Sequence, residues 1–289
     1  MAKRSKSKKN DSFASSRFII SNAPIQPALK FRIEEAYKSV RANIMFSVIK
    51  KGCKRIVVSS SNASEGKTTT TVNLAVTISQ ADQMVLLVDA DLRKPKIHQY
   101  FSLSNAPGLT NYLGDSVSSK GNTDIYNVIH PTEYENLSVL CSGSIPPNPA
   151  ELLGSVLMSD FLDDISKDYD YIIIDTPPIN VVSDALPLIR ESDGVVLVVR
   201  QNRTTHPELQ KALQSLEFID AKILGFVVNF VESKASKYGG KYNKYGYKYS
   251  YGKYGGYGYG GYGYGGYGYG GYGYGNSFSS KRDRDPRNN

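Results

Sequence analysis

Short apolar runs separated by amphipathic stretches limit this chain to one class of fold. The runs have the length of strands, and we predict strands at residues 55–60, 84–89, 137–141, 171–175, 194–200 and 223–230. We predict helices between them at 67–80, 149–165, 183–191 and 206–219, and a further helix at 33–48. Strands that are apolar on both faces and alternate with helices indicate an α/β fold: a mostly parallel sheet with helices on both faces.

The two ends of the chain have compositions that do not support a hydrophobic core. Residues 236–289 contain no aliphatic side chain and are rich in glycine, which loses the most backbone entropy on ordering. Residues 1–27 carry a basic cluster at positions 3–9. We therefore expect residues 1–27 and 236–289 to be disordered. Residues 28–235 remain as one domain, large enough to bury a full core.

A candidate phosphate loop follows the first predicted strand. Residues 61–68 read Ser-Asn-Ala-Ser-Glu-Gly-Lys-Thr and match G-x-x-x-x-G-K-[ST] except at the first glycine. In such a loop Gly66 permits close backbone approach, Lys67 places a cation on the β- and γ-phosphates, and Thr68 can ligate Mg²⁺. We predict an ATP site formed by Ser61, Asn62, Ala63, Ser64, Glu65, Gly66, Lys67, Thr68 and Thr69.

Two acidic motifs lie at the ends of other predicted strands. Residues 84–93 read Met-Val-Leu-Leu-Val-Asp-Ala-Asp-Leu-Arg, and residues 171–178 read Tyr-Ile-Ile-Ile-Asp-Thr-Pro-Pro. Because the carboxyl ends of parallel strands share one edge, we expect Asp89, Asp91 and Asp175 to converge near Thr68. Three carboxylates repel one another unless a cation lies among them, which implies Mg²⁺. A helix N-cap is the alternative for each aspartate taken singly.

The segment 238–275 is an array of phenols. It holds fifteen of the chain's twenty-two tyrosines, four lysines and no acidic residue, and residues 256–275 repeat Gly-Tyr-Gly-Tyr-Gly four times. A phenol hydroxyl accepts phosphate. A nucleotide site in the same chain therefore indicates an enzyme that phosphorylates its own tail. The candidate phosphoacceptors are Tyr238, Tyr242, Tyr245, Tyr247, Tyr249, Tyr251, Tyr254, Tyr257, Tyr259, Tyr262, Tyr264, Tyr267, Tyr269, Tyr272 and Tyr274.

The hypothesis gives each site residue a role. Lys67 and Mg²⁺ stabilise charge that develops on the γ-phosphate. Thr68, Asp91 and Asp175 hold the metal, directly or through water. Asp89 is the candidate to accept the tyrosine proton, although motif position does not separate base from ligand between Asp89 and Asp91.

Two more residues each have two interpretations. Arg93 pairs either with a carboxylate, as a structural salt bridge, or with a phosphate. Asn229, near the end of the last predicted strand, either meets the adenine edge or acts as a capping asparagine.

These motifs resemble those of the bacterial tyrosine kinases, P-loop kinases that govern capsule and exopolysaccharide synthesis. The phosphate loop, Asp-Ala-Asp-Leu-Arg at 89–93, Asp-Thr-Pro-Pro at 175–178 and the tyrosine-rich C-terminus carry the resemblance. Residues 146–153, Pro-Pro-Asn-Pro-Ala-Glu-Leu-Leu, look like a further segment typical of the family. The resemblance covers roughly residues 28–275. It implies a P-loop NTPase fold, ATP and Mg²⁺ as cofactors, and protein-tyrosine kinase activity.

The resemblance also implies partners. Glu35, Lys38 and Arg41 resemble the family's Glu-x-x-Arg-x-x-Arg helix, which mediates ring-shaped homo-oligomers, with lysine here at the second basic position. Family members without membrane spans pair with a transmembrane activator of the polysaccharide co-polymerase type, and a tyrosine phosphatase counteracts them. We expect a cytoplasmic protein, peripheral at the inner face of the plasma membrane through its activator.

Composition narrows the remaining choices. No apolar run reaches 18 residues, and the basic N-terminus lacks the apolar stretch of a signal peptide. Cys53 and Cys141 have neither metal-ligand spacing nor the number needed for a disulfide framework. The net charge of +8 is concentrated at the two ends, which are either solvated or weakly attracted to an anionic membrane.

Two other classes of function compete with the kinase. The partitioning and site-placing ATPases share the deviant loop, but they carry a lysine where Asn62 stands. Tyrosine–glycine arrays also stack, so the tail could form condensates or adhesive contacts. Nucleic-acid binding is disfavoured, because the tail repeats contain no arginine.

Overall fold

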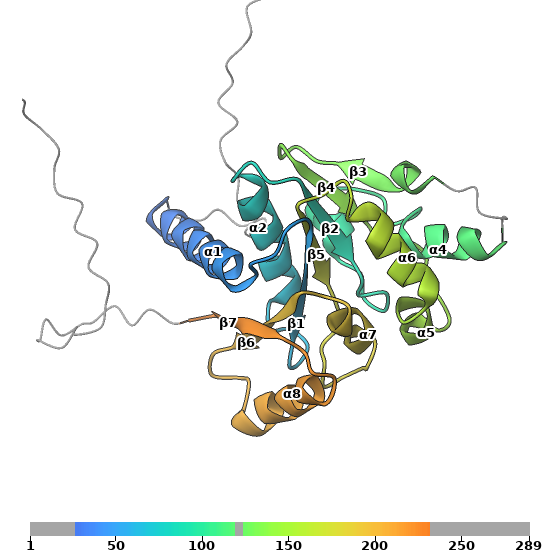
Figure 1. Ribbon diagram of the computed structural model, residues 1–289. Helices are drawn as coiled ribbons and strands as arrows, with labels where there is room; N and C mark the ends of the chain where they lie inside the picture. Colours follow the sequence, from blue (N-terminus) through green and yellow to red (C-terminus); the bar gives the residue numbers. More distant parts are fainter. Residues whose placement is uncertain (1–26, 119–123, 232–289) are drawn as a thin grey trace, which may run out of the picture. The chain divides into compact units, whose positions relative to one another are not determined.

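A seven-stranded sheet forms the centre of the protein, shown in Figure 1 as a computed structural model that describes residues 27–118 and 124–231. The strand order is β3-β4-β2-β5-β1-β6-β7, and every neighbouring pair is parallel except β3 and β4. The strands are β1 (Lys54–Ser60), β2 (Val85–Asp89), β3 (Ile129–Pro131), β4 (Leu137–Leu140), β5 (Tyr171–Asp175), β6 (Gly194–Arg200) and β7 (Ile223–Asn229). The predicted α/β fold is confirmed.

Helices cover both faces of this sheet. On one face the core contains side chains from α1 (Pro27–Ser47), α2 (Lys67–Ser79) and α3 (Ile97–Tyr100). On the other face it contains side chains from α4 (Leu109–Ser118), α5 (Pro149–Leu153), α6 (Val156–Ile165), α7 (Ala185–Arg190) and α8 (His206–Phe218). A short 3₁₀ turn, η1 (Ile125–Asn127), precedes β3. Figure 1 shows α1 and α2 together on one side, away from α6 and α7.

The period-2 geometry of the strands explains why they are apolar on both faces. In β1 the side chains of Ile56 and Val58 are buried in the core below α1 and α2, whereas Val57 is buried in the opposite core. The outermost strand β7 is different, because Phe226 and Val228 leave about half of their surface exposed. β7 is therefore an edge strand with one apolar face that the described residues cover only in part.

Several elements differ from the prediction. The segment predicted as one helix at 149–165 forms two, α5 and α6, because Gly154 ends the first and Ser155 caps the second by accepting a hydrogen bond from the Met158 N–H. Sequence periodicity also missed the short elements β3, α3 and α4. The helix predicted at 33–48 begins earlier, at Pro27, in α1.

Within the described ranges, no helix is both long and apolar enough to cross a membrane. The predicted disordered ends fall outside the described residues, apart from Pro27. The domain boundaries at 27/28 and 235/236 therefore stay predictions, and so does everything stated above about the fifteen tail tyrosines.

We expect Ser155→Ala to lower the free energy of unfolding by about 1 kcal/mol, because the variant loses the side-chain acceptor that caps α6. Chemical denaturation measures the change. Ser215→Ala is the matched control, since Ser215 lies within α8 and its hydroxyl bonds only the carbonyl one turn back. Equal costs for the two substitutions would contradict the assigned cap.

Candidate active site

The predicted site residues come from strands whose carboxyl ends form one edge of the sheet. β1 ends at Ser60 and leads through the loop 61–66 into α2, which begins at Lys67. β2 and β5 end at Asp89 and Asp175, which are partners in the parallel register. The left-handed backbone of Gly66, at φ +86°, sets the turn from loop to helix. Parallel pairing therefore brings the loop and the acidic motifs together, as the sequence predicts.

Lys67 is the centre of this edge. Its Nζ atom lies 2.8 Å from Asp175 Oδ1 and 3.5 Å from Asp91 Oδ2, and the side chain is only 7% exposed. Both carboxylates are buried as well. Buried charges need partners, so each of these three groups is held in place by the others.

Two threonines complete the surroundings of Asp175. Thr68 Oγ1 donates to Asp175 Oδ2 at 2.8 Å. Thr71 Oγ1 lies 2.8 Å from Asp175 Oδ1 and 2.9 Å from the Lys67 carbonyl, so one proton is shared between two acceptors. The carboxylate is thus fixed by two helix hydroxyls and one ammonium. Sequence reasoning did not identify Thr71, although it lies one helical turn from Lys67.

Asp89 is buried outside the cleft lining and organises the turn that follows β2. Its Oδ2 accepts from the N–H groups of Lys96 and Ile97, at 3.0 and 2.9 Å, and its Oδ1 accepts from the Asp91 N–H at 3.2 Å. Burial, and next the charge of Asp175, raise the pKa of Asp89 to about 7. The group can therefore change its protonation state near neutral pH.

Asp91 lies at the surface of the site, with 8% of the residue exposed. Its Oδ1 accepts from the Lys94 N–H at 3.1 Å. Burial raises the pKa of Asp91, and the neighbouring Lys67 ammonium opposes that shift. Of the two acidic residues in the first motif, Asp91 is the one whose carboxylate borders the cleft.

A side chain of the protein supplies a cation between two of the three predicted carboxylates. The sequence prediction placed three carboxylates together and required a cation among them. In the structure the Lys67 ammonium supplies that cation for Asp91 and Asp175. Residues 27–118 and 124–231 contain no group of three or more His, Cys, Asp or Glu arranged to hold a metal ion. Mutual repulsion of the carboxylates is therefore not an argument for a metal.

An open cleft of about 460 Å³ lies over the phosphate loop. Predicted residues that line it are Ala63, Ser64, Gly66, Lys67, Thr68, Thr69 and Asp91. Residues that sequence reasoning did not include are Ser60, Lys94, Lys96, Tyr100, Pro178, Arg200 and Phe230. Arg200 could have been found by the same rule as the aspartates, because it ends β6 at the same edge. Tyr100, whose hydroxyl lies 2.7 Å from Thr69 Oγ1, carried no signal.

One residue at the end of β6 and one just after it help to anchor the phosphate loop. Arg200 donates to the Ser64 carbonyl at 3.2 Å, and Thr204 donates to the buried Glu65 carboxylate. That carboxylate also accepts from the Asn62 N–H at 2.9 Å. Three separate bonds therefore fix a loop that contains two left-handed residues, Ser64 and Gly66.

Asn229 makes a further bond to the same loop. Its Nδ2 donates to the Glu65 carbonyl at 2.9 Å and to Thr70 Oγ1 at 3.0 Å. A Cβ atom on Gly66 would approach Asn229 Nδ2 to 2.5 Å, so only glycine fits beneath it. Asn229 thus braces the loop, and its predicted contact with adenine stays a prediction.

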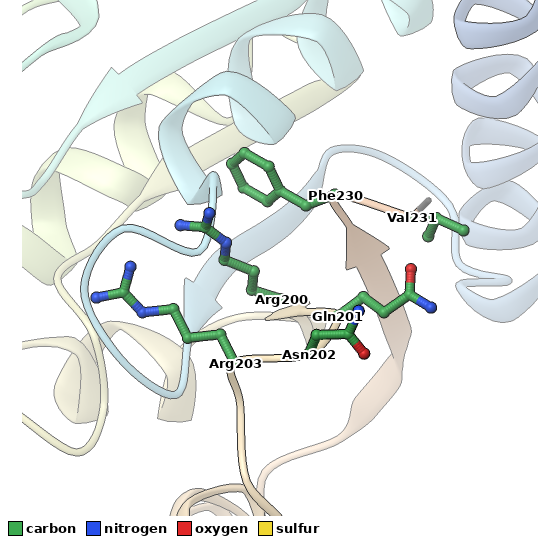
Figure 2. Close-up of a pocket in the computed structure, with 6 residues that line it drawn as sticks. All are labelled: Arg200, Gln201, Asn202, Arg203, Phe230 and Val231. Atoms are coloured by element: carbon green, nitrogen blue, oxygen red, sulfur yellow. The ribbon is translucent and has the colours of Figure 1, made fainter. Parts of the chain in front are cut away.

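Figure 2 shows a second cavity, of about 540 Å³, at the ends of β6 and β7. It shares Arg200 and Phe230 with the first, and the Arg200 guanidinium lies 3.9 Å from the centre of the Phe230 ring. Arg203, Gln201, Asn202 and Val231 complete the lining. In Figure 2 both arginines extend toward the loop that precedes α2. This cavity offers an aromatic face and polar groups on the β6–β7 side of the phosphate loop.

The other predicted residues make local contacts. Arg93 forms a two-pronged ion pair with the buried Asp184, at 2.6 and 3.1 Å, which is the structural salt bridge among its two interpretations. On α1, Lys38 Nζ lies 2.8 Å from Glu35 Oε1. Arg41 donates to the Thr77 carbonyl of α2 at 2.7 Å, within the same chain. The oligomer contact predicted for these α1 residues stays a prediction.

Comparison with known proteins decides the family. A family model described as an AAA domain matches residues 53–224. The tyrosine-protein kinase YwqD of Bacillus subtilis is 40% identical over 206 residues, which are 71% of this chain and 84% of YwqD. A tyrosine-protein kinase CpsD of Streptococcus agalactiae is 37% identical over 216 residues, 74% of this chain and 90% of CpsD. The chain belongs to the bacterial tyrosine-protein kinases.

Solved structures agree with this assignment to the tyrosine kinases. The crystal structure of the chimerical protein CapA2B2 has 36% identity and a TM-score of 0.66, over 76% of this chain and 91% of that one. The kinase domain of the Escherichia coli tyrosine kinase ETK has 33% identity and a TM-score of 0.65, over 72% and 80%. The septum site-determining protein MinD of Pyrococcus horikoshii, at 22% identity and a TM-score of 0.51, shares the fold alone. The protein is therefore a protein-tyrosine kinase.

We expect the kinase without nucleotide, in a metal chelator, to lose stability as pH rises from about 4 to about 7. In this range the folded state binds more protons than the unfolded state, because the Asp89 pKa is about 7 when folded and 3.8 in the reference state. Burial raises the Asp89 pKa most and the charge of Asp175 raises it further, whereas the Ile97 N–H and the Lys67 ammonium lower it. Asp89→Asn removes the ionisation, so its stability should depend less on pH. Ionisation of Asp89 should lower the free energy of unfolding of the wild type by at most roughly 4 kcal/mol across this pH range.

Urea denaturation of wild type and Asp89→Asn at several pH values measures this dependence. Asp160→Asn, an exposed change on α6, is the control and should keep the wild-type slope. If the free energy of unfolding changed with pH equally in wild type and Asp89→Asn, Asp89 would not titrate in this range.

Proposed function

We propose that this kinase transfers the γ-phosphoryl group of ATP to tyrosines of residues 238–275, in trans within an oligomer, and so regulates capsular or exopolysaccharide synthesis and export. One observation carries the proposal. The Lys67 ammonium, the Thr68 hydroxyl and the carboxylates of Asp91 and Asp175 meet beside an open cleft, in a chain that also supplies fifteen clustered phenols.

Three features of the cleft support the binding of a triphosphate. The N-cap of α2 is Gly66, which offers no side-chain acceptor, so N–H groups of the first turn remain for an anion. Lys67 would supply a cation to the β- and γ-phosphate oxygens. Thr68, Asp175 and Asp91 would hold Mg²⁺, directly or through water, with oxygen donors of the type that this ion prefers. The metal would neutralise charge on the β- and γ-phosphates.

Transfer breaks one bond and forms another. The tyrosine oxygen attacks the γ-phosphorus while the bond from that phosphorus to the β–γ bridging oxygen breaks, and ADP leaves with that oxygen. The tyrosine proton passes to a carboxylate of the protein. Lys67 acts by stabilising the charge on the transferred group, which is the main requirement of phosphoryl transfer.

Either Asp89 or Asp91 could be the general base that accepts the tyrosine proton. A pKa of about 7 suits Asp89 to general-base catalysis. Three backbone N–H groups bind its oxygens, however, so it would act through a water molecule or after a shift of the turn 91–97. Asp91 borders the cleft and is the rival. We keep Asp89 as the proposed base and Asp91 as the proposed metal ligand.

This division predicts different kinetic defects for the two asparagine variants. Asp89→Asn should lower kcat by about 100-fold and remove the acidic limb of the pH–rate profile, because it deletes the base. Asp91→Asn should raise the Mg²⁺ concentration needed for half-maximal rate and keep that limb. Initial rates between pH 5 and 9 at several Mg²⁺ concentrations measure both. The opposite pattern would exchange the two roles.

The tail has the reach and the composition of an acceptor. A glycine-rich chain of about 37 residues spans on the order of 35 Å, enough to enter the site of a neighbouring subunit. Tethering raises the local tyrosine concentration to about the millimolar range. Glycines between the tyrosines offer no fixed flanking pattern, so selection among the fifteen phenols should be loose.

Assembly and location follow from the family resemblance. Exposed Glu35 and Lys38 on α1 are available for a contact between copies in a ring. A transmembrane activator of the polysaccharide co-polymerase type would bring the kinase to the inner face of the plasma membrane, and a tyrosine phosphatase would reverse its action. The match to the chimerical protein CapA2B2 is consistent with such a two-component arrangement.

Labelling with γ-labelled ATP tests the proposal. Lys67→Met and Asp175→Asn should each lower phosphate transfer to the tail by about 100-fold or more, because each removes charge from the centre of the site. Lys211→Met, an exposed change on α8, is the control. Tail Tyr→Phe in the full chain should abolish labelling and leave the fold intact. Persistent labelling in Lys67→Met would refute the site.

Transfer in trans has its own test. A chain with an intact tail and Lys67→Met is mixed with an active chain whose tail tyrosines are all phenylalanine. Label on the inactive chain supports transfer between copies. Absence of label, with full labelling of wild type alone, would mean transfer within one chain.

A further inference from the structure

Two exposed lysines at the cleft have no partner among the described residues. Lys94 and Lys96 line the cleft, yet neither side chain forms an ion pair or a hydrogen bond in the described part of the chain. The neighbouring cations are already engaged, Lys67 by two carboxylates and Arg93 by Asp184. Lys94 and Lys96 therefore provide unused positive charge at the site.

The two acidic residues of the first motif fix the backbone that carries these lysines. The Lys94 N–H donates to Asp91 Oδ1 at 3.1 Å and to the Asp91 carbonyl at 3.2 Å. The Lys96 N–H donates to Asp89 Oδ2 at 3.0 Å. The turn is thus tied to the catalytic edge, while the two ammonium groups remain free to move at the end of flexible stems.

Sheet order places the lysines on the side opposite to Asn229. Arg200 and Asn229 end β6 and β7, which follow β1 on one side of the phosphate loop. Lys94 and Lys96 follow β2, which lies beyond β5 on the other side. Under the interpretation in which Asn229 meets adenine, the base of ATP lies on the Asn229 side and the lysines lie on the side left for the acceptor.

The unmodified tail offers these lysines no anion to bind. Residues 238–275 carry four lysines and no acidic residue. Each phosphotyrosine adds about −1.5 to −2 charge with strong acceptor oxygens. In residues 256–275 successive tyrosines are two or three residues apart. An extended chain therefore places a modified neighbour about 7–10 Å from the phenol in the site.

We infer that Lys94 and Lys96 bind a phosphotyrosine already formed on the tail, so that one transfer favours the next on the same tail. The inference rests on the proposed function, in which the tail is the acceptor. The ligand is a phosphorylated, acid-free tyrosine–glycine segment of a copy of this chain. The lysines act as specificity residues for the acceptor and take no part in the bond changes.

Matched peptides test the inference. Both carry residues 256–275, and one has Tyr262 phosphorylated. The enzyme is the full chain with tail Tyr→Phe, so that only the peptide is labelled. We expect kcat/KM for the phosphorylated peptide to be about 5–10-fold higher, mainly through KM, because two exposed charge pairs form. Lys94→Met/Lys96→Met should bring this ratio close to one, and Lys94→Arg/Lys96→Arg should restore it. The ratio should fall with added salt.

Each other result has one meaning. Labelling of neither peptide overturns the proposed function, and this inference with it. Equal kcat/KM for the two peptides in the wild-type background overturns the inference alone. A higher KM for ATP in the Met variant, with the peptide ratio unchanged, assigns the lysines to the nucleotide and also overturns it. Lys211→Met is the control for a lost surface charge, and equal melting temperatures confirm folding.

Discussion

The ion pair between Lys67 and Asp175 is the contact on which the rest of the site depends. It joins the first residue of α2 to the last residue of β5, across a 2.8 Å gap inside the protein. A buried ammonium without a partner costs several kcal/mol. The start of α2 and the end of β5 must therefore lie together, so that Lys67 and Asp175 can pair. Thr68, Thr71 and Asp91 are arranged around this contact. The fold and the chemistry of the site therefore share one constraint.

The phosphate loop is held from the other side by residues that follow it by more than 130 positions. Arg200 binds the Ser64 carbonyl, Thr204 binds the Glu65 carboxylate, and Asn229 binds the Glu65 carbonyl. Arg200 and Asn229 end β6 and β7, and Thr204 follows β6. Asn229 therefore ties the last strand of the described residues directly to the phosphate loop and to α2.

The sequence predicts much of this arrangement because the principal signals are local. Two apolar runs end in Asp89 and Asp175, so each motif predicts both a strand and a functional group. Parallel pairing of the two strands then brings the two aspartates together. The short elements could not be predicted in the same way, since β3 has three residues and α3 has four, too few for a periodic pattern. The split between α5 and α6 depends on a local choice at Gly154 and Ser155, and helical periodicity continues across it.

The sequence identified the residues of the site, but it did not predict which of them contact one another. Sequence reasoning identified Lys67 and the three aspartates, yet it placed Lys67 on phosphate and a metal between the carboxylates. The buried carboxylates of Asp91 and Asp175 need a cation, and the Lys67 ammonium contacts both. Mg²⁺ held by Asp91 and Asp175, as proposed, would share their oxygens with that ammonium. Lys94 and Lys96 differ from Lys67, because they need no protein partner. They are exposed, so water satisfies them, and their charge remains available for an anion that residues 238–275 carry only after phosphorylation.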